Sequence, residues 1–129
     1  MIMEDKVNSV LWVFQILVAL VFLATGIPKV MLPKEKLERR MGWVKEAPVS
    51  TVKIVGVLEI LGAVGLILPA VTGILPWLTP LAATGLTLTM IGAIATHVRQ
   101  VEYSRMWLPI SLLFLAVFIA YGRFVVAPI

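Results

Sequence analysis

The chain has no cysteine, a single histidine and few charged residues. Without cysteine it forms no disulfide, carries out no thiol chemistry and holds no thiolate metal site or iron–sulfur cluster. The single histidine, His97, supplies too few ligands to hold a haem or a metal ion well. We therefore expect no metal site and no redox centre of the chain's own.

Charged residues make up 14% of the 129 residues, and hydrophobic residues make up 60%. A soluble domain has about 25% charged and about 45–50% apolar residues, so this composition predicts a membrane protein. The length suits one small bundle and not two domains. The net charge of +4 could suggest nucleic acid, but basic residues of membrane proteins mark the cytoplasmic loops. We expect no nucleic-acid partner.

Four apolar runs divide the chain, and each is long enough to cross a bilayer as a helix of about 17–25 residues. They cover about residues 9–27, 52–69, 77–97 and 106–124. The first is interpreted as a retained helix, because its core is long for a signal peptide and no clean cleavage pattern follows. Short connections make consecutive helices antiparallel neighbours. The sequence thus predicts an all-α fold, a transmembrane four-helix antiparallel bundle, in one domain over residues 1–129.

The one long polar loop, residues 28–50, contains a segment with a helical pattern. Residues 34–44 place Leu37, Met41 and Val44 on one face. This spacing predicts a short amphipathic helix in the first loop. Such a helix can lie in the membrane interface, or it can close over the mouth of the bundle as a lid. Both positions stay open at this point.

Lysine and arginine are distributed unequally between the two ends of the predicted bundle. Two lie on the side of the termini, Lys6 and Arg123. Nine lie on the other side: Lys29, Lys34, Lys36, Arg39, Arg40, Lys45, Lys53, Arg99 and Arg105. Because cytoplasmic loops carry the excess of positive charge, we predict that both termini are outside and the charged loops are cytoplasmic, in the plasma (inner) membrane.

One acidic residue, Glu59, lies in the middle of the second apolar run. A carboxylate at that depth costs about 2.5–3.5 kcal/mol on insertion scales, so it should face protein and have a partner. Lys29 ends the first run and His97 ends the third, both on the predicted cytoplasmic side. Gly56 and Gly62 flank the acid at three residues on either side and would admit a close neighbour or leave a cavity.

Other polar residues lie along the predicted spans. Gln15 suits an interhelical hydrogen bond or a lipid-facing amide. Arg123 suits an anchor whose long side chain reaches the interface. A stripe of small and hydroxyl residues in the third run would let another helix approach: Thr84, Gly85, Thr89, Gly92, Ala93 and Thr96.

Three motifs resemble the DoxX-like family of small integral membrane proteins. They are Gly26-x-x-Lys29, Gly56-x-x-Glu59-x-x-Gly62 followed by Leu66 and Leu68, and Ala93-x-x-x-His97. The resemblance extends from about Val10 to Arg123, and Val30 stands where we expect a leucine. It implies a four-helix membrane bundle. Since founding members are small subunits of a membrane thiosulfate:quinone oxidoreductase, it also implies a redox association.

The first functional hypothesis is a quinone-proximal or redox-associated membrane subunit with a soluble redox partner. Its candidate ligand-binding or proton-handling residues are Glu59, Lys29, His97, Gly56 and Gly62, with no catalytic residue. No cofactor is evident, although a quinone could bind. The same charges could instead form a structural ion pair that fixes helix register. The alternatives are a small proton-coupled transporter or exporter and a non-enzymatic assembly protein with a membrane-protein partner. The lipid-facing surface of four helices also allows a homodimer.

Overall fold

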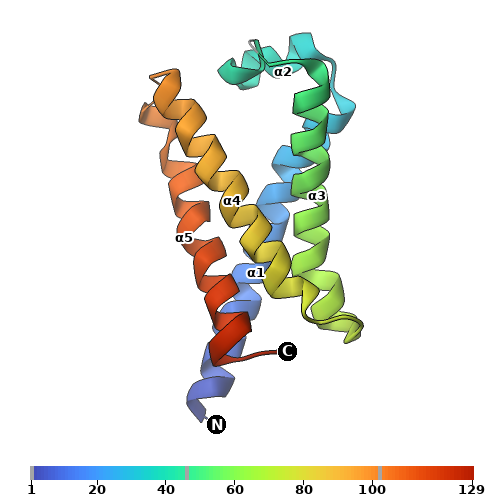
Figure 1. Cartoon of the computed structure of the whole chain (residues 1–129), viewed down its shortest axis with the longest axis vertical. Coiled ribbons are helices and arrows are strands. Elements are labelled where there is room, and N and C mark those ends of the chain that lie inside the picture. Colours follow the sequence, from blue (N-terminus) through green and yellow to red (C-terminus); the bar gives the residue numbers. More distant parts are fainter. Residues whose placement is uncertain (1, 46, 102) are drawn as a thin grey trace.

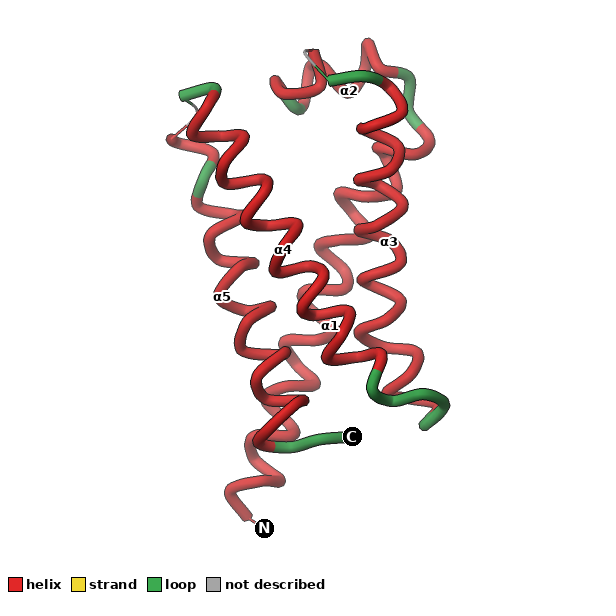
Figure 2. The backbone as a smooth tube through the Cα atoms, viewed as in Figure 1, coloured by secondary structure: helices red, strands yellow, loops and turns green. Residues whose placement is uncertain are grey.

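The computed structural model describes residues 2–45, 47–101 and 103–129. Within these residues the chain is helical and has no strand (Figure 1, Figure 2). The long helices are α1 (Ile2–Met31), α3 (Val49–Thr72), α4 (Leu78–Arg99) and α5 (Trp107–Tyr121). The shorter segments are α2 (Lys34–Arg40), the 3-10 turns Gly42–Lys45 and Tyr103–Arg105, and a π-helical turn, Gly122–Val126.

Among the described residues, four helical stretches are long and apolar enough to cross a membrane, as the sequence predicts. They are Met3–Met31, Val49–Thr72, Leu78–Arg99 and Tyr103–Val126. The first span continues beyond the predicted end at residue 27, since Pro28 does not end α1 but lies inside it. A proline removes its own backbone N–H and crowds the carbonyl four residues back, but the Pro28 carbonyl still accepts a hydrogen bond from the Leu32 N–H at 2.8 Å, so the helix continues. Lys29 is therefore part of the helix and has a fixed direction.

Consecutive spans run antiparallel and pack against each other, which confirms the predicted bundle (Figure 1). Helix α1 packs on α3, and α4 packs on α5. Helices α3 and α4 meet near the turn that joins them, where Ala82 and Leu86 pack on Gly65 and Gly62. There the Thr79 hydroxyl also donates to the Gly65 carbonyl at 3.0 Å. Towards its other end, α4 leaves α3 and follows α5 (Figure 1).

The predicted small-residue stripe of α4 does not make this contact. A Cβ added at Gly85 or at Gly92 would meet nothing within 4 Å. The hydroxyls of Thr89 and Thr96 donate to carbonyls one turn back in their own helix, at 2.9 Å each. Within the described chain, α4 thus packs on α3 through a different face.

Helix α2 lies across the loop end of the α1–α3 pair (Figure 1). The α-helix ends at Arg40, earlier than the predicted Val44, because Met41 adopts an extended backbone before the 3-10 turn begins. The predicted apolar face does form: Leu37 and Val44 are buried against Val52 of α3, with Met41 packed beside them. These contacts favour the lid over a helix that lies free in the interface.

Candidate functional site

The Glu59 carboxylate is enclosed by the α1–α3 pair. The residue is 2% exposed, and both of its carboxylate oxygens accept hydrogen bonds. The Lys29 ammonium donates to Oε1 in a salt bridge, and the Thr25 hydroxyl donates to Oε2. Lys29 is itself buried. The acid therefore has the partner that its depth requires.

Glycines bring α1 close enough to α3 for this pairing. Val52, Gly56, Glu59, Ala63 and Leu66 are all buried and follow a three- and four-residue spacing along α3, so they share one face.

On that face, α1 and α3 touch backbone to backbone. A Cβ added at Gly56 would lie 2.8 Å from the Gly26 carbonyl oxygen and 2.8 Å from the Cβ of Lys29. A Cβ at Gly26 would lie 2.9 Å from the Gly56 carbonyl oxygen. Only glycine fits at this crossing, and the close approach sets Lys29 directly over the Glu59 face.

Thr25 is a member of the site that the sequence analysis missed. It lies one turn before Lys29 on α1, so both residues face the same neighbour. That spacing was a usable signal. A threonine among apolar residues gave no contrast, however, because its hydroxyl can bond to its own helix, as it also does here to the Phe22 carbonyl.

The other predicted glycine, Gly62, faces a different helix. A Cβ added there would lie 2.5 Å from the Leu86 side chain of α4. Gly62 therefore lets α4 pack closely on α3, whereas Gly56 lets α1 pack closely on α3 at the ion pair.

His97 does not join the ion pair. It is half-buried in the last turn of α4. Leu86 packs on Gly62, which lies one turn from Glu59. From Leu86, His97 is a further eleven residues along α4, roughly 16 Å, whereas Glu59 is roughly 5 Å from Gly62 along α3. Since α4 also diverges from α3 at that end (Figure 1), the predicted cluster of three ionisable groups is a buried pair with a threonine.

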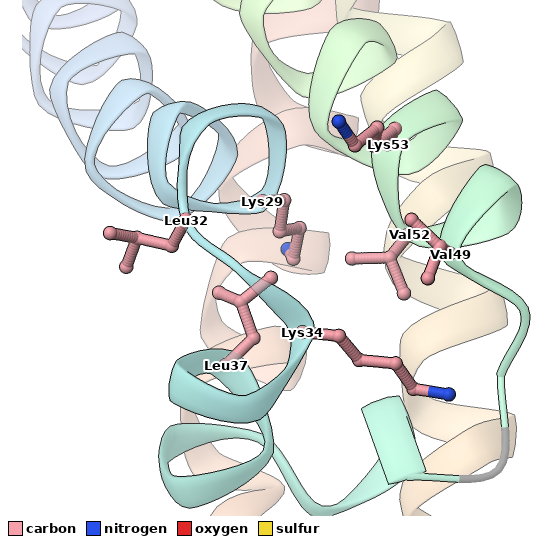
Figure 3. A pocket seen from close by; sticks show the side chains of 7 residues that line it. All are labelled: Lys29, Leu32, Lys34, Leu37, Val49, Val52 and Lys53. Carbon is pink, nitrogen blue, oxygen red and sulfur yellow. The ribbon is translucent and has the colours of Figure 1, made fainter.

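A small pocket lies under α2 on the loop side of the pair. Its volume of about 10 Å³ holds roughly one water molecule. It is lined by Lys29, Leu32, Lys34, Leu37, Val49, Val52 and Lys53 (Figure 3). The ammonium groups of Lys29, Lys34 and Lys53 point in different directions (Figure 3), so the three lysines do not converge on a common anion.

A larger groove runs along the α1–α3 seam on the other side of the pair. Its volume is about 370 Å³. It is lined only by apolar side chains: Ile16, Ala19, Leu20, Leu23, Ala63, Val64, Ile67 and Leu68. Ile16, Leu20 and Leu68 are about half exposed, so the groove opens to the lipid. Thr25, Lys29 and Glu59 do not line the groove, but Ala63 in its wall lies one turn from Glu59 on the same face of α3.

Comparison with known proteins decides the family. The sequence model of the DoxX-like family matches residues 13–119. This chain belongs to the DoxX-like family. No curated protein and no solved structure matches it.

The DoxX-like chain holds a second polar cluster at the end where its termini lie. Arg123 is 2% exposed, so its side chain turns into the bundle instead of extending outward as the predicted anchor would. Its Nε donates to Gln15 Oε1 at 2.6 Å, and its Nη1 donates to Asn8 Oδ1 at 2.7 Å and to the Ala127 carbonyl at 2.9 Å. The Gln15 amide in turn donates to the Leu66 carbonyl at 2.6 Å, which confirms the predicted interhelical hydrogen bond.

Position along the helix explains why Arg123 points inward. The buried residues Pro109, Leu112, Ala116 and Ile119 follow each other at three- and four-residue spacings, and Arg123 is the next position of the series. On α1, Asn8 and Gln15 are seven residues apart and thus share a face. In retrospect these two spacings indicate the cluster. The sequence alone could not assign Arg123 to the buried face, because the fourth run is so uniformly apolar that no face of it stands out.

The part of the DoxX-like chain that the structure describes holds no group of three or more potential metal ligands. The two polar clusters offer an ion pair with a hydroxyl at one end and a guanidinium with two amides at the other. Their chemistry is hydrogen bonding and ion pairing.

Proposed function

We propose that this DoxX-like protein is an accessory membrane subunit of a quinone-linked redox system and that it holds the quinone in the α1–α3 groove. The observation that carries the proposal is an apolar groove open to lipid, one wall residue of which, Ala63, lies one turn from Glu59 in the buried Thr25–Glu59–Lys29 group. A quinone needs both parts, since its chain is apolar and its ring oxygens accept hydrogen bonds. The family supports a redox association in addition.

The residues present fit such a ligand. The groove walls are aliphatic, and the side chains of Ala19 and Ala63 are small. The Thr25 hydroxyl and the Lys29 ammonium are the donors of the buried group, and both now donate to Glu59. A ring oxygen would draw on these donors, while Glu59 would hold or release a proton.

A bound quinone would supply reversible reduction by two electrons and two protons. The chain itself contributes binding, orientation and exclusion of water from the Glu59 pair. Without cysteine and with one histidine, it has few groups to hold an electron-transfer metal. We therefore propose that a soluble partner delivers or accepts the electrons.

The proposal is tested by measuring the binding of a quinone analogue to the purified protein in nanodiscs. Leu20→Trp and Leu68→Trp place a bulky ring at the groove and should weaken binding roughly tenfold or more. Leu61→Trp is the matched control, because Leu61 is equally lipid-exposed on α3 but does not line the groove. Glu59→Gln should reduce proton-coupled redox activity in membranes that contain the partner. Equal binding by all three tryptophan variants would contradict the proposal.

A specific observation favours a second candidate, a membrane assembly protein. A Cβ at Gly85 or Gly92 of the stripe would meet nothing within the described chain, whereas neighbouring helices occupy the space at Gly26, Gly56, Gly62 and Gly65. Another membrane protein or a second copy could use that face. If so, Gly85→Leu should remove a copurifying protein and leave quinone binding unchanged.

The structure favours a proton-coupled transporter less. A carboxylate that already accepts from Lys29 and Thr25 is less available to a basic substrate. Substrate flux driven by a proton gradient in proteoliposomes would restore that alternative.

A further inference from the structure

The Arg123 cluster leaves part of the guanidinium unsatisfied. Its Nη2 is buried, and no described group accepts a hydrogen bond from it. The three acceptors that Arg123 does have are two side-chain amides and a backbone carbonyl, all neutral. The Trp12 ring lies 5.7 Å from the guanidinium carbon and is the nearest further compensation. Within the described residues, Arg123 forms no ion pair with a carboxylate.

A buried guanidinium with an unsatisfied nitrogen is suited to a negatively charged partner. Arginine is always protonated, and its planar fork matches the oxygens of a phosphate or a carboxylate. Hydrogen bonds between ionised partners are roughly twice as strong as those between neutral groups, so an oxyanion would outcompete a backbone carbonyl. If the Ala127 carbonyl left, one Nη1 hydrogen would become available in addition to the unsatisfied Nη2.

The position of Arg123 along the chain favours the lipid headgroup layer as the source of this anion. Arg123 lies three residues before the end of the fourth membrane-length helix. Tyr121 and Phe124 beside it are 60% and 56% exposed, as aromatic residues at a membrane interface are. The segment that follows Val126 crosses this end of the bundle (Figure 1), and its Ala127 carbonyl occupies one Arg123 donor.

A second donor is available at the same place. Asn8 accepts from Arg123 through its carbonyl oxygen, which leaves its NH₂ group available to another acceptor. That NH₂ group makes no hydrogen bond in the described structure, and Asn8 is exposed. An oxyanion that replaces the Ala127 carbonyl would thus meet Nη1 and Nη2 of Arg123 together with the Asn8 amide.

We propose that Arg123 and Asn8 form a binding site for a phosphate group of net negative charge, at the end of the bundle opposite the Lys29–Glu59 pair. The phosphate belongs to an anionic lipid headgroup or comes free from the aqueous phase. Gln15 is a positioning residue, because it holds Arg123 through Nε while its own amide is fixed on α3. The site is independent of the proposed quinone groove.

The test uses the full chain in nanodiscs of phosphatidylcholine, alone or mixed with phosphatidylglycerol. Native mass spectrometry measures which lipid is retained, and thermal unfolding measures stabilisation. We expect retention of phosphatidylglycerol over phosphatidylcholine, whose choline neutralises its phosphate. Inorganic phosphate added to phosphatidylcholine discs forms the second arm: a rise in Tm there identifies a site open to free phosphate, and a rise with phosphatidylglycerol alone identifies a headgroup site.

Variants assign the effect to the site. Arg123→Gln should lower phosphatidylglycerol retention roughly tenfold or more, and Asn8→Ala should lower it less. Lys6→Gln, which removes an exposed cation at the same end of the bundle, should leave retention nearly unchanged. Equal loss in Arg123→Gln and Lys6→Gln would overturn the proposal. So would a wild type that prefers neither anionic lipid nor phosphate.

If the Arg123→Gln variant does not fold, a measurement on the wild-type protein alone still tests the proposal. Side-chain nitrogen resonances of Arg123 should shift when phosphatidylglycerol or phosphate is added. Unchanged resonances under both additions would overturn the proposal as well.

Discussion

At the scale of single residues, the ion pair between Lys29 and Glu59 has little contact with solvent. The two side chains are 9% and 2% exposed. Removing one partner of a buried pair typically costs about 3–5 kcal/mol, because the other charge is left uncompensated. We expect Lys29→Met to lower the free energy of unfolding by about that amount, measured by denaturant titration in mixed micelles.

The control for this prediction is Lys53→Met, which removes an exposed lysine of α3 and should have an effect within about 0.5 kcal/mol. The double variant Lys29→Met/Glu59→Leu should recover much of the loss, since apolar side chains can replace a buried pair. A Lys29→Met protein as stable as Lys53→Met would show that the pair contributes nothing to the fold.

The glycines offer a matched comparison at the same scale. Gly56→Ala would place a Cβ 2.8 Å from both a backbone oxygen and the Lys29 Cβ, so α1 must move away from α3. We expect a loss of about 1–3 kcal/mol in the free energy of unfolding. Gly92→Ala meets nothing and should stabilise α4 by about 0.5–1 kcal/mol through helix propensity. If both variants destabilise equally, close packing at Gly56 is not the cause.

At the scale of the element, α2 has a defined support. Leu37 is 2% exposed and Val44 is fully buried, both against the loop end of α3. Leu37→Ala should cost about 2–5 kcal/mol of local stability and release the lid. Limited proteolysis should then cut the segment between α1 and α3 faster than in the wild type. Arg39→Ala on the exposed side of α2 is the control, and equal cleavage rates in the two variants would show that the lid is not held by its apolar face.

The helices also show which features of the fold could be predicted from the sequence. Long apolar runs predicted the four spans, because a membrane demands about 20 apolar residues of a helix. The sequence could not assign faces: when nearly every residue of a span is apolar, the 3.6-residue period has no polar contrast. Arg123 was therefore placed outward, and Thr25 was missed. Glu59 and Lys29 were paired correctly because two charges in an apolar bundle have few alternatives.

The error at His97 has a different origin. The sequence places both His97 and Lys29 at the predicted loop side, and a parallel bundle of straight helices would bring them together. The structure separates them, because α4 follows α5 and leaves α3 beyond Leu86 (Figure 1). Helix crossing depends on how side chains of different helices interlock, which a single sequence does not reveal.

At the scale of the whole molecule, the structure sharpens the charge asymmetry. Arg123 is buried, so Lys6 is the one basic residue of its side that is not buried among the described residues, against eight on the α2 side, where Lys29 is also buried. The positive-inside rule therefore still predicts α2 and the α4–α5 turn in the cytoplasm.

Cysteine labelling in intact cells measures this orientation directly, because the natural chain has no cysteine and gives no background. Ile74, in the turn between α3 and α4, is 69% exposed, and Ser104 is exposed in the turn before α5. We expect Ile74→Cys to react with a membrane-impermeant maleimide from outside and Ser104→Cys to react only after permeabilisation. The reverse pattern would place Lys29 and Glu59 near the outer surface and the Arg123 cluster near the cytoplasm. It would also move the proposed redox partner to the other side of the membrane, because that partner must approach the end of the bundle nearest Glu59.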